Sequence, residues 1–210
     1  MKDSNDKPVL AFDCSTPVGS VALACGDVSH ERTLEPGTHA TLLVPMIEEV
    51  MQQAGVRYTD LDCIVTTVGP GSFTGVRIGL ATLHGLALAH NLPVKITTSL
   101  QAMAYHFAMP NYAVALHAGK GQHCLQEFEG VTPVSTIQLV EPSVIENRLD
   151  CYGSHRDPDG FVFLSGPQAW KLAAIAPLLP VTPLAEAVPI YIRPADAKVS
   201  APPPWLPGPA

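Results

Sequence analysis

Three short runs rich in apolar residues follow one another within the first 34 residues, and only turns separate them. The runs cover residues 8–14, 20–26 and 28–34, and the third alternates polar and apolar residues as an edge strand does. Linkers this short join strands that lie side by side in opposite directions. We therefore predict an antiparallel meander, which commits the start of the chain to a sheet.

Helices and strands alternate after the meander. Apolar residues recur at helical spacing through residues 38–54, with Thr38 as a candidate cap and Gly55 as the stop. That helix contains Pro45, which we expect to kink it. Further along, the pattern predicts a strand over 62–69, a helix ending near 90, a strand over 92–98 and a helix over 99–108 capped by Ser99.

The second half of the chain is shorter and less regular. It predicts two strands around a turn at 119–121, a strand over 134–140, short helices over 142–149 and 166–176, a strand over 161–166 and an extended segment over 187–194. A meander followed by alternating helices and strands is typical of a ribonuclease-H-like lobe. Two such lobes make the actin/sugar-kinase architecture. We predict this α/β fold, with a first lobe over 1–100, a shortened second lobe over 101–195 and an unstructured Pro-rich tail over 196–210.

The glycine-rich stretch VGPGSFTGVRIGLATLHGLALA, residues 68–89, suggests a phosphate-binding loop but fits neither common motif. A P-loop needs Lys after its last glycine, whereas Val76 follows Gly75, and the spacing is not GxGxxG. No Asp or Glu occurs between Cys63 and Gln126, so the region lacks the carboxylate that a magnesium–nucleotide site uses. Ser72 is better placed to cap the helix that follows.

Asp13 is the one carboxylate well placed in the first lobe, at the end of the first predicted strand. With Ser15 and Thr16 it forms a candidate vestigial nucleotide site. Two interpretations remain open: a turn-forming carboxylate bonded to backbone amides, or a magnesium ligand of an actin-like ATP-dependent phosphotransferase or ATPase.

Other catalytic patterns are missing from the sequence. The eight histidines form no HxxxH or HExxH pair, which argues against a metalloprotease, and no GxSxG occurs. We expect no metal site and no cofactor. The net charge is −7 and no two Lys or Arg residues lie closer than five positions apart, so an independent nucleic-acid surface is not expected.

Composition indicates an apolar protein that meets a partner. Hydrophobic residues make up 47% of the chain and charged residues only 15%. We find no signal peptide and no run long enough for a membrane helix. Five cysteines without a CxxC pair favour reduced thiols, and hence a cytoplasmic protein.

The helix that starts near Phe73 is apolar on nearly every side, which predicts burial within the chain or between two chains. Gly75 and Gly79 are four residues apart and leave a bare stripe that another backbone can approach.

Three segments, LAFDCSTPVGSVAL, HATLLVPMIEEVM and VGPGSFTGVRIGLATLHGLALA, resemble the TsaB (YeaZ) family of bacterial tRNA threonylcarbamoyladenosine biosynthesis, most strongly over residues 8–105. The resemblance implies a non-catalytic subunit rather than an enzyme. It would form a heterodimer with the catalytic subunit TsaD, which transfers threonylcarbamoyl to adenosine 37 of tRNA. The ATPase TsaE would join the pair, tRNA would be met only through the complex, and a homodimer would form without the partner.

The resemblance also implies a helical interface built from the two long helices of the first lobe. The residues that would face the partner are Leu42, Leu43, Met46, Ile47, Gly75, Ile78, Gly79, Leu83 and Leu86. One departure lies in the second lobe, where His117-Ala118-Gly119 replaces the Asp-Ala-Arg that family members often carry, so any anion contact from that arginine is absent.

Overall fold

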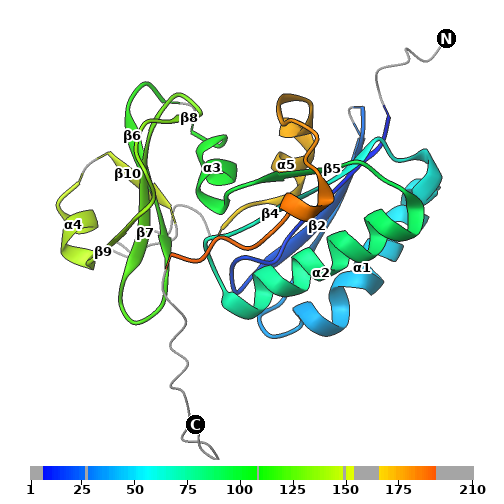
Figure 1. Ribbon diagram of the computed structural model, residues 1–210, viewed down its shortest axis with the longest axis horizontal. Helices are drawn as coiled ribbons and strands as arrows, with labels where there is room; N and C mark the ends of the chain where they lie inside the picture. The colour runs from blue at the N-terminus through cyan, green and yellow to red at the C-terminus, as the bar shows by residue number, and fades with distance from the viewer. Residues whose placement is uncertain (1–6, 27, 108, 149, 154–165, 193–210) are drawn as a thin grey trace, which may run out of the picture.

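The computed structural model describes residues 7–26, 28–107, 109–148, 150–153 and 166–192 (Figure 1). The tail over 196–210 lies outside these residues, as does all but Gly166 of the strand predicted over 161–166.

The first sheet begins with the predicted meander. Strands β1 (Val9–Asp13), β2 (Gly19–Cys25) and β3 (Val28–Leu34) pair antiparallel, and β4 (Cys63–Thr67) and β5 (Val94–Thr97) extend the other edge in parallel. The resulting order is β3-β2-β1-β4-β5. Strand β1 is therefore central, and its carboxyl end lies beside that of β4.

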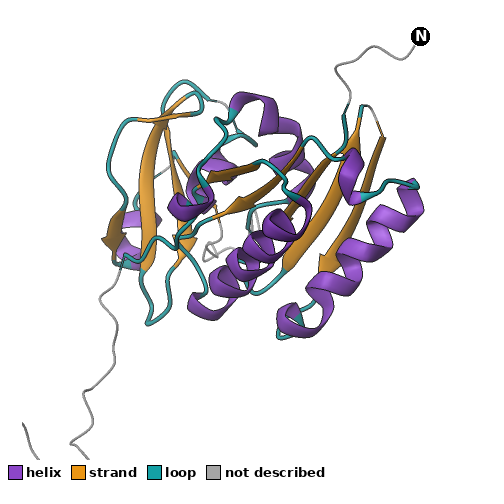
Figure 2. Ribbon diagram, turned by 45° about the vertical axis from the view of Figure 1, so that its right-hand side comes forward, coloured by secondary structure: helices purple, strands orange, loops and turns teal. Residues whose placement is uncertain are grey.

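Two long helices cover one face of this sheet, α1 (His39–Ala54) and α2 (Phe73–His90), and both views show them side by side (Figure 2). Helix α1 ends at Gly55 in the left-handed conformation, as predicted, and it continues as one helix through Pro45. Thr38 occupies the cap position of α1, but its hydroxyl donates to the Glu35 carbonyl instead of capping.

The core fills the space between these helices and the sheet. Leu10 and Phe12 of β1 and Ile47 and Leu83 of the helices are fully buried there. Burial of each such side chain contributes roughly 1.5–3 kcal/mol, so this layer holds the first lobe together.

The second sheet follows a short helix, α3 (Ser99–Ala104), which Thr98 caps by accepting from the Gln101 amide at 3.0 Å. Ser99, the predicted cap, is instead the first helical residue. The elements of this lobe are β6 (Tyr112–His117), β7 (His123–Glu129), β8 (Thr132–Pro133), β9 (Gln138–Val140), α4 (Pro142–Glu146) and β10 (Cys151–Gly153). Strand order is β10-β6-β7-β8, with β9 also paired to β7.

The chain then returns to the first sheet. Helix α5 (Ala169–Ile175) packs on the face opposite α1 and α2, against β1 and β2, and the Ala169 amide donates to Ser20 Oγ at 2.8 Å (Figure 1). Although the predicted second lobe spans 101–195, its last described part thus covers the first sheet. The two-sheet α/β architecture confirms the predicted fold class.

Residues 182–192, which we name the C-terminal strap, cross the β5 edge and then follow α2. The Thr182 amide donates to the Val94 carbonyl at 2.9 Å, and the Ile190 amide donates to the Val68 carbonyl at 2.8 Å. His84 of α2 bonds to the Ala187 carbonyl at 2.9 Å. The strap therefore forms a second wall beside α2.

Candidate functional site

The turn after β1 brings Asp13, Ser15 and Thr16 together, and all three are buried. Oδ1 of Asp13 accepts a hydrogen bond from the Thr67 hydroxyl, and Oδ2 accepts from the amide and the hydroxyl of Ser15, each at 3.1 Å. Burial raises the pKa of Asp13 from 3.8 to about 6, although these bonds oppose the shift. Both carboxylate oxygens are thus occupied within the turn.

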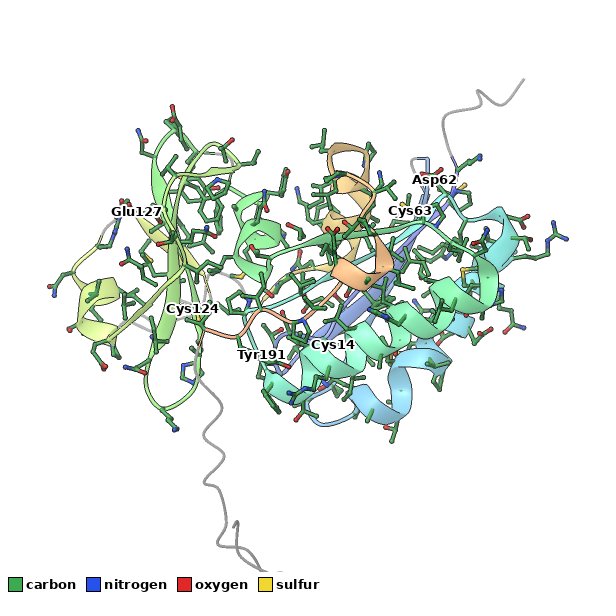
Figure 3. All side chains as sticks on the ribbon, viewed as in Figure 1. Cys14, Asp62, Cys63, Cys124, Glu127 and Tyr191 are labelled. Carbon is green, nitrogen blue, oxygen red and sulfur yellow. The ribbon has the colours of Figure 1, made fainter. Side chains whose placement is uncertain are left out.

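Glycine backbones close over this turn. A Cβ added to Gly75 would lie 2.0 Å from the Cys14 carbonyl oxygen, and one added to Gly71 would lie 2.1 Å from that of Ser15. On another side, a Cβ on Gly166 would lie 2.4 Å from Thr16 Oγ1. Figure 3 shows Cys14 beneath α2. The turn is therefore packed against its own chain on two sides.

His39 lines a further side of the same turn. It is buried, and its Nε2 has no hydrogen-bond partner among the residues that the structure describes, while a Cβ added to Gly19 would lie 2.9 Å from it. Burial lowers the pKa of His39, against an opposing backbone hydrogen bond with Thr16. A neutral imidazole in this position acts as packing rather than as a cation for phosphate.

Five of the predicted partner-facing residues lie inside the chain, which corrects that expectation. Leu43, Ile47 and Leu83 belong to the core under the sheet. Gly75 and Gly79 are buried against the turn after β1, with the Gly79 position 3.6 Å from Cys14 Cβ. These glycines allow another backbone to approach α2 closely. That backbone belongs to the same chain, because this side of α2 packs on the sheet.

The other four predicted residues remain accessible in part: Leu42 is 37% exposed, and Met46, Ile78 and Leu86 are half-buried. Sequence reasoning missed further exposed apolar side chains on the same helices. We define the outer face of α1 and α2 by the residues Leu42, Val44, Met46, Phe73, Ile78, Ala81, Gly85, Leu86 and Leu88.

The outer face of α2 carries exposed apolar side chains and, at Gly85, a residue without a side chain. Leu88 is 73% exposed and Phe73 is 52% exposed. A Cβ added to Gly85 would meet no atom of the described residues within 4 Å, so this glycine, unlike Gly75, faces open space beside them. The exposed side of α2 could have been found in the sequence as a second set of positions at helical spacing, 77, 81, 85 and 88, which lie between the buried positions.

Within the described ranges of the chain, no group of three His, Cys, Asp or Glu residues could hold a metal ion. Within the same ranges, no helix is long and apolar enough to cross a membrane.

Comparison with known proteins points to one family. The family model described as TsaD, tRNA N6-adenosine threonylcarbamoyltransferase, matches residues 36–144. The tRNA threonylcarbamoyladenosine biosynthesis protein TsaB of Haemophilus influenzae is 41% identical over 97 residues, which cover 46% of this chain and 41% of that protein. The Escherichia coli protein of the same name is 39% identical over 151 residues, covering 67% of this chain and 65% of that protein.

The match therefore spans less than two thirds of these relatives' own length. A solved structure, YeaZ from Pseudomonas aeruginosa, is similar over 89% of this chain and all of that one, with a TM-score of 0.74 and 25% identity. The sequence comparisons and the structural comparison name the same family. The chain belongs to the TsaB (YeaZ) family.

Proposed function

We propose that this chain is a non-catalytic subunit of tRNA threonylcarbamoyladenosine biosynthesis. It acts by forming a heterodimer with the catalytic subunit TsaD and activating transfer of threonylcarbamoyl to adenosine 37 of tRNA. The ATPase TsaE joins this pair, tRNA is met through the complex, and a homodimer forms through the same helices when TsaD is absent. The names of the relatives support the pathway.

The observation that carries the proposal is the outer face of α1 and α2. On α2 this face leaves Leu88 and Phe73 largely exposed and Ile78 and Leu86 half-buried. Apolar surface that a folded chain leaves exposed in this way marks a site of interaction, of which a protein–protein contact is one kind. Gly85 leaves room for a second helix to approach α2 closely.

The non-catalytic role is supported by the closed turn at Asp13. A phosphotransferase would need this carboxylate on magnesium or as a general base. Thr67 and Ser15 already occupy its two oxygens, and Gly75 covers the turn from above. ATP turnover by the purified chain alone, abolished by Asp13→Ala, would overturn this part of the proposal.

Light scattering of the chain mixed with TsaD from the same organism tests the contact. Leu88→Asp places a charge in the outer face, and we expect the dissociation constant to rise about 100-fold or more, because a buried unpaired carboxylate costs roughly 3 kcal/mol. The matched control is Leu178→Asp, since Leu178 is 69% exposed and follows α5. Equal binding by both variants would show that TsaD does not use the outer face.

A further inference from the structure

Arg77 is the only Asp, Glu, Lys or Arg in α2, and two aromatic rings hold it in place. Its guanidinium carbon lies 3.3 Å from the centroid of the Phe73 ring and 5.2 Å from that of Tyr191. The two rings are 5.4 Å apart, and Tyr191 belongs to the C-terminal strap (Figure 3). The cation is therefore fixed at the junction of α2 and the strap.

In the described part of the chain, the guanidinium is fixed by rings and not by a charged partner. Within the described residues, Arg77 forms neither a hydrogen bond nor an ion pair, and its side chain is exposed. Ring stacking uses the flat faces of a guanidinium and leaves the N–H donors at its edges available for a planar anion. An arginine held in this way loses little further freedom when it binds one.

We propose that Arg77 pairs with a carboxylate of TsaD in the heterodimer contact, an inference that rests on the proposed function. Arg77 lies on the same side of α2 as Ala81, Gly85 and Leu88, so a partner that covers the outer face also removes water from Arg77. An unpaired guanidinium is costly to desolvate. An apolar partner helix alone would not tolerate it. The partner must therefore bring an anion, and a carboxylate matches the guanidinium fork with two parallel hydrogen bonds.

A second copy of this chain fits the position less well. Helix α2 contains no acidic residue, and both acidic residues of α1 are already engaged. Glu48 accepts from the Tyr58 hydroxyl at 2.6 Å, and Glu49 pairs with Arg32 at 2.9 Å. Both carboxylates of α1 thus already have a partner within the chain, so we expect self-association through these helices to be weaker than the contact with TsaD.

RNA phosphate fits less well too. Binding of a nucleic-acid backbone uses several cations together. Among the described residues of α2 and the C-terminal strap, Arg77 is the one Lys or Arg. One cation within an apolar surface suits one carboxylate of a protein partner.

Titration calorimetry with TsaD from the same organism tests the pairing at low and high salt. We expect Arg77→Ala to weaken binding about 30-fold or more and Arg77→Lys about 10-fold, because an ammonium lacks the planar fork. Phe73→Leu keeps the apolar side chain but removes the ring, and we expect an intermediate loss. The salt dependence of binding should become smaller in Arg77→Ala.

The matched control is Lys171→Ala. Lys171 also lies over an aromatic ring, 4.6 Å from the centroid of Trp170, but on α5 at the opposite face of the sheet. We expect this variant to bind TsaD like the wild type. Thermal melts of all variants check that each is folded.

The outcomes separate the two proposals. If the wild-type chain does not bind TsaD, the proposed function fails and this inference fails with it. If the wild type binds and Arg77→Ala binds equally well, the inference is refuted while the proposed function stands. If Arg77→Ala loses only self-association, the anion belongs to a second copy of this chain. If it loses only the retention of tRNA by an intact complex, the anion is a phosphate. Either result would also refute the inference.

Discussion

Three glycines in α2 should respond to alanine in three different ways, and this series tests the packing of the helix directly. Each Gly→Ala change in a helix interior contributes about 1 kcal/mol of stability if nothing else changes. At Gly85 nothing lies within 4 Å of the new Cβ, so we expect the full gain. At Gly79 the nearest atom is Cys14 Cβ at 3.6 Å, an ordinary contact, so the gain should be similar.

Gly75 is the opposite case. Its new Cβ would lie 2.0 Å from the Cys14 carbonyl oxygen, and backbone atoms on both sides of the contact must move. Forced overpacking costs up to roughly 3 kcal/mol, so after the helical gain we expect a net loss of about 2 kcal/mol. The assay is urea unfolding at 25 °C, with unchanged m-values as the check that the unfolded states are comparable.

Two results would refute this account of α2. If Gly75→Ala is as stable as the wild type, the helix does not lie against the turn after β1. If Gly85→Ala is destabilised, the outer side of the helix is covered and cannot be the docking surface. A gain of 1 kcal/mol corresponds to a rise in melting temperature of about 2–4 °C in a chain of this size, which is measurable.

Two further predictions concern pH and the turn at Asp13, and both are read from unfolding free energies across a pH series. Burial raises the pKa of Asp13 from 3.8 to about 6, so the contribution of Asp13 to the free energy of unfolding is full below pH 3.8 and is lost as pH rises through 6. Relative to Asp13→Asn, the wild type should therefore lose about 3 kcal/mol between pH 3.5 and 7. A difference between the two proteins that stays constant with pH would mean that the carboxylate is hydrated. His39 should show the opposite pH dependence, because burial lowers its pKa. Its contribution to the free energy of unfolding is present at neutral pH and is lost as pH falls below 6.5. The variant His39→Gln should not show this loss. An identical acid response of the two proteins would place that imidazole in water.

Most of the first lobe could be predicted because its signals are local. The meander, the end of α1 at Gly55 and the cap of α2 at Ser72 each depend on neighbouring residues alone. The choice between Thr98 and Ser99 as the cap of α3 is finer, because it depends on which residue keeps the extended backbone of a cap, and Thr98 does with φ −76° and ψ 154°. The return of α5 to the first sheet depends on contacts far apart in the chain, such as Ser20 with Ala169.

Sequence reasoning placed the candidate site on α1 and α2, but it did not identify which side of these helices faces away from the sheet. A helix that is apolar all round gives no sign of which side its own sheet will cover. The sequence therefore indicated that α2 meets a backbone through glycines, and the structure assigns Gly75 and Gly79 to the chain itself and Gly85 to the outside. Exposed Leu88 lies in the outward set, and its exposure could not be read from hydrophobicity alone.

The inner and outer faces of α2 work together in the proposed contact. On the inner face, the Ser72 amide donates to the Ser15 carbonyl at 2.6 Å and Gly75 rests on Cys14, so the first turn of the helix cannot shift without disturbing β1. On the outer face, that same turn carries Phe73 and, one turn later, Arg77. A side chain presented from an anchored turn loses less conformational entropy on binding than one on a mobile loop. The glycines that start α2 would thus contribute to affinity indirectly, by fixing the cation that TsaD is proposed to meet.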